Sequence, residues 1–363
     1  MATEVIHSKA PTRIDLAGGT LDIWPLYLFL KNPMTLNLGI NLFAEAKIHS
    51  IFPKEKSGPE IRFLSEDQGV ELECTWSELS QNLIQPPSSL TLHFQLLKFF
   101  YEKKLKLTEK AHDPGQIVFS TSAQSPAGAG LGGSSTLGIA MAGALDAWAG
   151  LGSSHDSLIE VVRDIEAQII QVPAGLQDYY GAMYGGLQSL HWGIGKHSQT
   201  RWPQDRLKEI EKRLLLFYSG QSRNSGINNW TLFKNFIDQK KGIRDRFQKI
   251  ASATQEIENA ILSQDWEAVG LGISEEWAHR KTLSPGITTP EIDFVFSETS
   301  KIAPISGKVC GAGGGGCFFI YLSNPELLKD LQSKILKILE NRKIQHLPFQ
   351  GVEHGLEVHV QSS

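Results

Sequence analysis

The stretch SPAGAGLGGSST at residues 125–136 carries the pattern in this chain that is best suited to holding a phosphate. Its four glycines leave backbone N–H groups accessible, and a helix is predicted to begin at about Ser134. Free N–H groups and the positive end of a helix dipole attract an anion, and hydroxyls in the first turn can reach the phosphate or a phosphate-bound Mg²⁺. The pattern therefore predicts a cradle for a triphosphate.

Other interpretations of this glycine loop fit the residues less well. Gly128, Gly130 and Gly133 satisfy G-x-G-x-x-G, but the loop lies deep in the chain. A dinucleotide-binding fold would also need an acidic residue at the end of a second strand about 20 residues later, and that position falls between helices here. A Walker A loop would have lysine where the chain has Ser134. Glycines that served only helix packing would leave the serine pair unexplained.

Composition argues against several other functions. The 363 residues carry a net charge of −4 and no basic stripe that could follow a nucleic acid backbone. Cys74, Cys310 and Cys317 are too few for a disulfide framework and lack zinc-ligand spacing. The chain shows no apolar leader and no apolar run as long as a membrane span. We therefore expect a cytoplasmic protein that binds neither nucleic acid nor membrane, with an oligomeric state that the sequence leaves open.

Length and patterning predict two domains. The polar stretch 191–206 is broken by glycine and proline, so we place a boundary there, with an N-terminal domain at 1–200 and a C-terminal domain at 201–363. Interleaved strands and helices indicate an α+β or α/β fold without choosing between them. The expected strands are 44–52, 60–65, 115–123, 213–220 and 355–361, and the expected helices are 89–107, 134–148, 156–170 and 325–342.

The glycine loop resembles the second motif of the GHMP kinases, which include galactokinase and the homoserine, mevalonate and phosphomevalonate kinases. That motif reads Pro-x-x-x-Gly-Leu-Gly-Ser-Ser, and this chain has Gly133 at the first serine and Ser134 at the second. KAPTRIDLAGGTLD at 9–22 is similar to the first motif, Ala-Pro-x-Arg/Lys-x-x-x-x-Gly, and KVCGAGGGGCFFI at 308–320 is similar to the third. The three motifs occur in the family's order and span nearly the whole chain.

The resemblance implies an α+β GHMP kinase fold that uses ATP and Mg²⁺. Its N-terminal domain would resemble the second domain of ribosomal protein S5, and its C-terminal domain would be ferredoxin-like. Ser134 would bind Mg²⁺ together with Glu166, with Ser135 and Asp164 as the alternative ligands. A solvated helix glutamate is the plain alternative for Glu166. The ATP-binding residues implied by the second motif are Pro126, Gly128, Ala129, Gly130, Leu131, Gly132, Gly133, Ser134 and Ser135.

PAGLQDYYGAMYGG at 173–186 resembles the segment that carries the base in the heptose-phosphate kinase branch of the family. Asp178 matches the catalytic aspartate of that segment. Residue type alone would allow Asp178 to be a capping or turn residue. Arg13 falls at the Arg/Lys position of the first motif, where it would pair with Asp178 and offset charge on the transferring phosphoryl group. Lys9 is the nearby competitor and fits the motif less well.

The same resemblance implies residues that bind the acceptor. Asp22 lies where the galactokinase branch has an aspartate that bonds sugar hydroxyls. Arg223 and Lys281 would face the substrate or, alternatively, be surface cations. The third glycine motif would lie beside the phosphate loop or, on the plain interpretation, form a mobile hairpin turn. The implied substrate-binding residues are Asp22, Gly18, Gly19, Arg223, Gly313 and Gly314.

The sequence thus predicts an ATP-dependent kinase that phosphorylates a hydroxyl of a sugar or sugar phosphate, with the anomeric hydroxyl of a heptose 7-phosphate favoured. Ala17 and Leu21 depart from the Gly-Gly-Gly-Thr-Asp of the heptose-phosphate branch, so the sugar stays open. A mevalonate-type isoprenoid kinase is the alternative within the family. A non-catalytic sugar or nucleotide sensor and a nicotinamide oxidoreductase are the alternatives outside it. The joint presence of all four predicted catalytic and metal-binding residues argues against a sensor.

Overall fold

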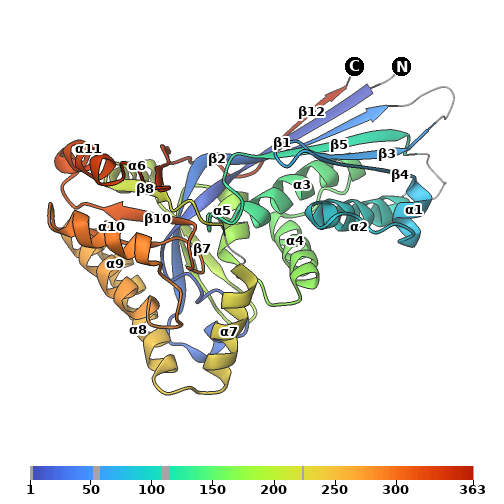
Figure 1. Cartoon of the computed structure of the whole chain (residues 1–363). Helices are drawn as coiled ribbons and strands as arrows, with labels where there is room; N and C mark the ends of the chain where they lie inside the picture. The colour runs from blue at the N-terminus through green and yellow to red at the C-terminus, as the bar shows by residue number, and fades with distance from the viewer. Residues whose placement is uncertain (1–2, 52–57, 108–113, 223–224, 363) are drawn as a thin grey trace.

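The computed structural model describes residues 3–51, 58–107, 114–222 and 225–362, which form two β-sheets with helices packed against them (Figure 1). The larger sheet has the strand order β12-β1-β2-β5-β3-β4, with β6 and β7 continuing from β2. Its strands are β1 (Thr3–Ala17), β2 (Met34–Ile51), β3 (Ile61–Ser65), β4 (Val70–Cys74), β5 (Gln116–Ala123), β6 (Leu187–His191), β7 (Ser198–Arg201) and β12 (Glu357–Ser362).

The smaller sheet is antiparallel, with the order β11-β8-β10-β9. It comes from the second half of the chain, and Figure 1 shows it at the opposite end of the molecule from the two termini. Its strands are β8 (Leu214–Tyr218), β9 (Ser306–Val309), β10 (Cys317–Tyr321) and β11 (Gln345–His346). The third glycine motif therefore includes the turn that joins the paired strands β9 and β10.

The helices divide between the two sheets (Figure 1). Those beside the larger sheet are α1 (Trp76–Gln81), α2 (Thr91–Leu107), α3 (Gly133–Ala149), α4 (His155–Ile170) and α5 (Gln177–Tyr184). Those of the second half are α6 (Gln204–Glu211), α7 (Ser225–Ile237), α8 (Ile243–Ser263), α9 (Trp266–Arg280), α10 (Pro290–Ser300) and α11 (Leu328–Ile338). Three short 3₁₀ helices, η1 (Leu26–Phe29), η2 (Ser88–Leu90) and η3 (Pro325–Leu327), complete the described elements.

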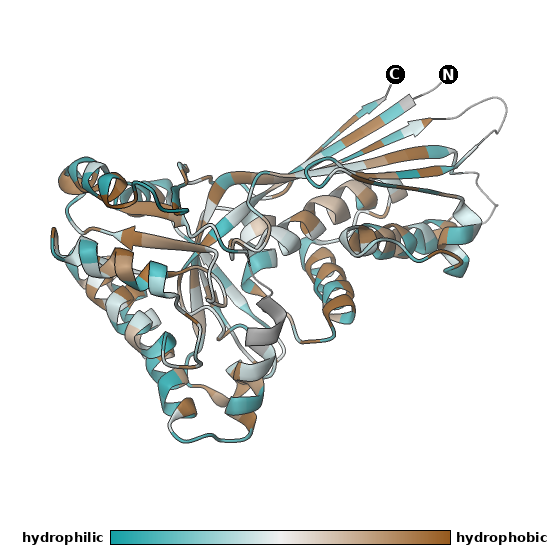
Figure 2. Cartoon of the chain, in the orientation of Figure 1, coloured by the Kyte–Doolittle hydropathy of each residue, from teal (hydrophilic) through white to brown (hydrophobic). Residues whose placement is uncertain are grey.

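Helix α3 lies at the centre of the N-terminal core and is buried on nearly all sides. Small residues allow this packing. A Cβ at Gly138 would lie 2.5 Å from Val162 of α4, and one at Gly143 would lie 2.8 Å from Leu356. Apolar and polar residues alternate along the strands that cover α3 (Figure 2). This packing holds the first residues of α3 in place, and the glycine loop leads directly into them.

A second apolar core joins the two halves of the molecule. Ile14 and Leu36 of the larger sheet belong to the same buried cluster as Ile257 and Ile273 of α8 and α9 and Phe319 of β10. Burying such side chains is worth roughly 1.5–3 kcal/mol each, so the halves are held together firmly enough to share a site.

The last strand of the chain lies in a different sheet from the one that was expected. The prediction assigned 355–361 to the C-terminal domain, but β12 pairs antiparallel with β1 and so belongs to the larger sheet. The contiguous part of that sheet ends with β7, close to the predicted boundary, and the last strand returns to it. The α+β class is confirmed, because the mainly antiparallel sheets are combined with segregated helices. Among the described residues, every helix is too short or too polar to cross a lipid bilayer.

Candidate active site

A cavity of about 480 Å³ lies where the glycine loop, α5 and the turn after β1 meet. A volume of this size is typical of small-molecule sites. Most of the predicted site residues border it. They are Arg13, Asp22, Pro126, Gly128, Ala129, Gly130, Gly132, Gly133, Ser134, Ser135, Glu166 and Asp178.

The glycine loop forms one wall of this cavity and leads directly into α3. Gly128, Gly130 and Gly132 all have positive φ, between 68° and 77°, which favours glycine over any residue with a side chain. Gly132 is also the N-cap of α3, so it has no side chain that could occupy the N–H groups of the first turn. Those N–H groups and the helix dipole suit an anion.

The third glycine motif packs against the back of this loop. The backbone N–H of Cys317 donates to the carbonyl oxygen of Ala129 at 2.6 Å. A Cβ at Gly316 would lie 2.6 Å from that same oxygen, so glycine is required for the close approach. The expected neighbourhood of the two glycine segments is therefore present.

Arg13 and Asp178 form an ion pair at the cavity. Arg13 Nε donates to Asp178 Oδ1 at 2.9 Å, and Nη2 donates to the same oxygen. Nη1 donates to the carbonyl oxygen of Gly130 at 2.8 Å, which ties the pair to the glycine loop. Burial lowers the pKa of Arg13, but the carboxylates of Asp178 and Asp15 outweigh burial and raise it, so the guanidinium stays charged.

Two glycines make room for this ion pair. A Cβ at Gly132 would lie 3.1 Å from Cγ of Asp178, so the missing side chain lets the carboxylate rest against the start of α3. A Cβ at Gly181, one turn along α5, would lie 2.9 Å from Cγ of Arg13. The aspartate is thus held between a cation and the positive end of a helix.

Glu166 of α4 lies beside the first turn of α3. Its Oε2 accepts hydrogen bonds from Ser135 Oγ at 2.9 Å and from Tyr179 OH at 2.7 Å. Burial raises the pKa of Glu166, although hydrogen bonds from Ser134, Tyr179 and Ser135 act in the opposite direction. The alternative carboxylate, Asp164, is exposed and pairs with Arg163, so it does not reach the cavity.

This oxygen-rich group fits Mg²⁺. One carboxylate and the hydroxyls of Ser134 and Ser135 are hard ligands of the kind Mg²⁺ prefers. In the part of the chain that the structure describes, no three His, Cys, Asp or Glu side chains gather into a metal cage. A magnesium ion here would complete its coordination with phosphate oxygens and water, as this ion commonly does. Ser134 and Ser135 both lie in the first turn of α3 and border the cavity, so each hydroxyl is a candidate ligand.

Asp22 faces the cavity close to Asp178. Its Oδ2 accepts a hydrogen bond from the backbone N–H of Gln177 at 3.0 Å, which joins the turn after β1 to α5. Burial, with a smaller contribution from the charge of Asp178, raises the pKa of Asp22 to about 6. In the same turn, the β-branched Thr20 has a φ of 77°, a strained conformation for such a residue.

Several residues predicted to bind substrate do not border the cavity. Gly18 and Gly19 lie behind its wall, where the N–H of Gly18 donates to Glu276 Oε1 at 3.2 Å. Gly314 donates to the carbonyl oxygen of Ile287 at 2.7 Å, and Gly313 also packs on Ile287. From the third motif, Gly311 and Ala312 border the cavity instead. Leu131 is buried in the core, Lys281 is exposed at the end of α9, and Arg223 lies outside the described residues.

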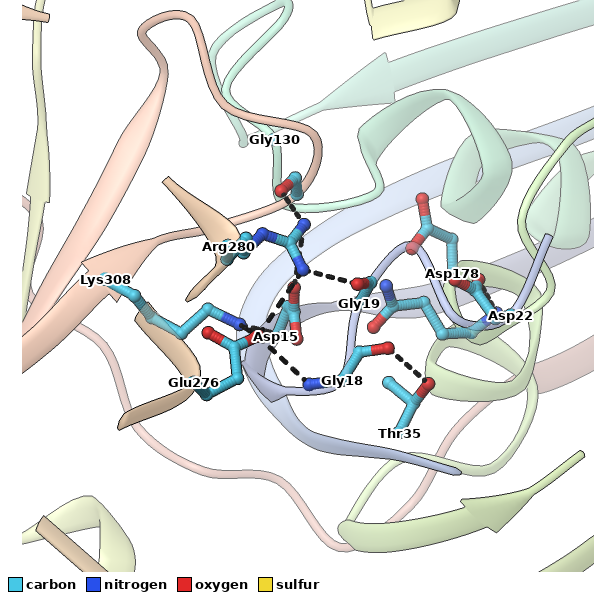
Figure 3. A network of polar contacts seen from close by, with 12 residues as sticks. Asp15, Gly18, Gly19, Asp22, Thr35, Gly130, Asp178, Glu276, Arg280 and Lys308 are labelled. Atoms are coloured by element: carbon cyan, nitrogen blue, oxygen red, sulfur yellow. Dashed lines mark hydrogen bonds and ion pairs between the residues drawn. The ribbon is translucent and has the colours of Figure 1, made fainter. Parts of the chain in front are cut away.

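Four buried charges lie next to this site and were not among the predicted site residues. Figure 3 shows Asp15, Glu276, Arg280 and Lys308 beside Gly18 and Gly19, with Asp22 and Asp178 beyond them. A signal was present, because Asp15 and Lys308 each occur in an apolar strand segment. A charge on a buried strand needs a partner of opposite sign.

Two family models match the chain. The model for the GHMP kinases N terminal domain matches residues 96–186, and the model for the GHMP kinases C terminal domain matches residues 257–341. These ranges cover the glycine loop with Asp178 and the third glycine motif.

Curated relatives and solved structures agree with these matches. The D-glycero-alpha-D-manno-heptose 7-phosphate kinase of Campylobacter jejuni is 24% identical over 88% of this chain and 90% of its own length. The L-fucokinase/L-fucose-1-P guanylyltransferase of Bacteroides fragilis is 24% identical over 98% of this chain, which spans only 38% of that protein. A D-glycero-D-manno-heptose 1-phosphate kinase structure from Bacteroides thetaiotaomicron superposes with a TM-score of 0.71 at 20% identity, over 98% of both chains. Residues 96–186 and 257–341 are thus the N-terminal and C-terminal GHMP kinase domains of this chain, and the relatives that share them are named as phosphotransferases.

Proposed function

We propose that this chain transfers the γ-phosphoryl group of ATP to a hydroxyl of a sugar or sugar phosphate, and that the anomeric hydroxyl of a heptose 7-phosphate is its acceptor. The observation that carries the proposal is the ion pair of Arg13 and Asp178, held against Gly132 at the start of α3. A carboxylate beside a phosphate cradle can accept the proton of an attacking hydroxyl.

The donor would lie along the glycine loop. The N–H groups of Gly133, Ser134 and Ser135 begin α3 and would bind phosphate oxygens. Glu166 and the hydroxyl of either Ser134 or Ser135 would hold Mg²⁺, which neutralises charge on the phosphates when bound.

The transfer itself needs little covalent chemistry from the protein. The acceptor oxygen attacks the γ-phosphorus, the bond from phosphorus to the bridging oxygen breaks, and ADP leaves with the bond's electron pair. The acceptor proton passes to Asp178 Oδ2, the oxygen that does not receive the Arg13 hydrogen bonds. Arg13 is close enough to offset negative charge as it develops on the phosphoryl group.

The acceptor class is supported by two kinds of observation. Asp22 is a buried carboxylate at the cavity, and ionised carboxylates accept hydrogen bonds from sugar hydroxyls. The heptose-phosphate kinase and fucokinase relatives act, by their names, on sugars or sugar phosphates. A cytoplasmic location is part of the same proposal, because Cys74, Cys310 and Cys317 are free thiols.

The test is ADP release from Mg-ATP with a panel of acceptors: hexoses, fucose, heptoses, heptose 7-phosphates, mevalonate and homoserine. We expect turnover with a heptose 7-phosphate and a product phosphorylated at the anomeric oxygen, which phosphorus NMR identifies. Turnover with mevalonate alone would replace the sugar with an isoprenoid acceptor. Bound ATP with no turnover across the panel would contradict the proposed kinase activity and favour a sensor. An incubation without acceptor measures background hydrolysis.

A further inference from the structure

The charges of Asp15, Glu276, Arg280 and Lys308 form one closed group, which we term the buried charge cluster. Lys308 Nζ lies 2.8 Å from Glu276 Oε1 and 3.3 Å from Asp15 Oδ1. Arg280 lies 3.5 Å from Glu276 and 3.6 Å from Asp15. No member is more than 2% exposed, and the two cations balance the two carboxylates. Burial raises the pKa of Asp15, but Lys308, Arg280 and Arg13 outweigh burial and hold it below its ordinary value.

Arg280 makes contacts that Lys308 does not. Its Nη1 donates to the carbonyl oxygen of Gly19, and its Nη2 donates to that of Gly311 at 2.5 Å. Within the described chain, Lys308 Nζ donates hydrogen bonds only to the two carboxylates, and Lys308 does not border the cavity. One guanidinium therefore joins the turn after β1 to the third glycine motif, while the lysine only balances charge.

The two segments that Arg280 joins form the side of the cavity next to Asp178. Gly19 precedes Thr20 and Asp22, which both border the cavity, and Gly311 borders it as well. The turn is not self-supporting, because Thr20 has a positive φ, a strained conformation that persists only where surrounding contacts enforce it. The N–H of Gly18 is held by Glu276 of the same cluster.

We propose that Arg280 is a positioning residue that sets the width of the acceptor side of the cavity. Glu276 and Asp15 hold the guanidinium plane, and the guanidinium holds the two loop carbonyls that belong to different halves of the molecule. The planar fork of arginine makes this possible, since a lysine ammonium has one compact head and no fixed donor geometry. The inference rests on the proposed function, because that function assigns the acceptor to this side.

The experiment compares Arg280→Lys with Lys308→Met as the matched control. Arg280→Lys keeps the cluster neutral but has no fork to span the two carbonyls. We expect it to fold and to bind ATP with an unchanged Kd, while kcat/KM for the acceptor falls by about 10²-fold, since small misplacement of reacting groups is costly. Lys308→Met removes a charge and leaves both Arg280 carbonyl contacts in place. We expect it to melt at a lower temperature than wild type with a much smaller change in acceptor kcat/KM.

Hydrogen exchange gives a measurement that does not depend on the acceptor. In Arg280→Lys we expect faster amide exchange in residues 18–22 and 311–316, with residues 128–136 unchanged. Unchanged exchange or unchanged acceptor kcat/KM in this variant would overturn the proposal. A parallel loss of ATP affinity, or a fall in melting temperature as large as that of Lys308→Met, would also overturn it, because Arg280 would then be a folding residue. Silence of the wild type with every acceptor contradicts the proposed function instead, and the exchange data still report whether Arg280 ties the segments.

Discussion

The two sides of the cavity are built in different ways. The glycine-loop side comes mainly from one continuous stretch, residues 125–136, which offers backbone N–H groups and small hydroxyls, with Glu166 of α4 beside it. The opposite side comes from the turn after β1, α5, the end of α9 and the third glycine motif. It is held together by charged side chains, among them Arg13, Asp178 and Arg280.

The difference predicts how each side responds to substitution. A backbone cradle depends on conformation, so it is damaged by adding a side chain where only glycine fits. A buried set of ion pairs depends on charge balance, so removing one partner leaves another charge without compensation. A substitution that changes backbone conformation should therefore mainly damage the glycine-loop side. A substitution that removes a charge should mainly damage the opposite side.

The largest expected effect is that of Asp178→Asn. The amide keeps the size of the carboxylate but cannot accept the acceptor proton, so we expect kcat to fall by roughly 10² to 10⁴-fold, the usual range for a general base. Because the cradle is unchanged, the Kd for ATP should stay close to that of the wild type. Steady-state kinetics with the best acceptor and ATP titration by calorimetry measure the two quantities. Near-normal turnover would remove Asp178 from the mechanism.

Glu166→Gln should have the next largest effect, and it acts on the glycine-loop side. Removing the charge weakens an oxygen-ligand site, so we expect the Mg²⁺ concentration at half-maximal rate to rise by about tenfold or more. Ser134→Ala and Ser135→Ala extend the comparison, because the serine that binds the ion should show the larger shift. An unchanged Mg²⁺ requirement in Glu166→Gln would return this residue to a packing role. Mn²⁺ binding measured by electron paramagnetic resonance checks the site without turnover.

Gly132→Ala should reduce activity less than Asp178→Asn or Glu166→Gln, and it tests backbone conformation without changing a charge. Gly150→Ala is its matched control. Gly132 is the N-cap of α3 and Gly150 is its C-cap, and both have positive φ, 76° and 68°. Nothing lies within 4 Å of a Cβ at Gly150. Each variant should lose about 1 kcal/mol of stability from backbone strain. Only Gly132→Ala should also reduce kcat/KM, by about tenfold, because its methyl group displaces Asp178 and the first-turn N–H groups. Equal kinetics in the two variants would contradict a tight fit at Gly132.

The same contrast explains what the sequence could predict. The glycine loop and α3 were predicted nearly to the residue, because turn glycines, hydroxyls and a small-residue helix are local signals. The pairing of Arg13 with Asp178 was also predicted, but only through the family resemblance, since 165 positions separate the two residues.

The remaining features depend on tertiary structure. The β1–β12 pairing joins the two ends of the chain, and no local pattern indicates which sheet the last strand completes. The buried charge cluster joins β1, α9 and β9, and although Asp15 and Lys308 lie in apolar strand segments, no local pattern indicates which charges they meet. For the same reason, the family resemblance implied that Gly313 and Gly314 bind the substrate, although both contact Ile287.

Asp22→Asn should have the smallest effect on rate, and it should raise the stability of the protein where Gly132→Ala lowers it. The pKa of Asp22 is about 6 in the folded protein against an ordinary value of 3.8. As pH rises between these values, the carboxyl ionises in the unfolded chain before it does so in the folded one. Stability is therefore lost over this interval, and the full cost is present above pH 6. From a shift of roughly two pKa units, asparagine should raise the free energy of unfolding by up to about 3 kcal/mol at pH 8.

Urea unfolding of both proteins at pH 4 and pH 8 measures this effect. The gain in stability should shrink towards zero at pH 4, because Asp22 is then largely protonated in the folded protein and most of the cost of burying its charge has gone. At pH 8 the same variant should bind the acceptor more weakly, with a KM about tenfold higher, since an amide has one oxygen where the carboxylate has two acceptors for sugar hydroxyls. A stabilised variant with an unchanged acceptor KM would mean that the charge of Asp22 is buried for a reason other than substrate binding. A variant with higher KM and no gain in stability would mean that the carboxyl is already protonated or well solvated at pH 8. Only the combination of higher stability and weaker acceptor binding fits a carboxylate that the fold keeps charged, at a cost, for the acceptor.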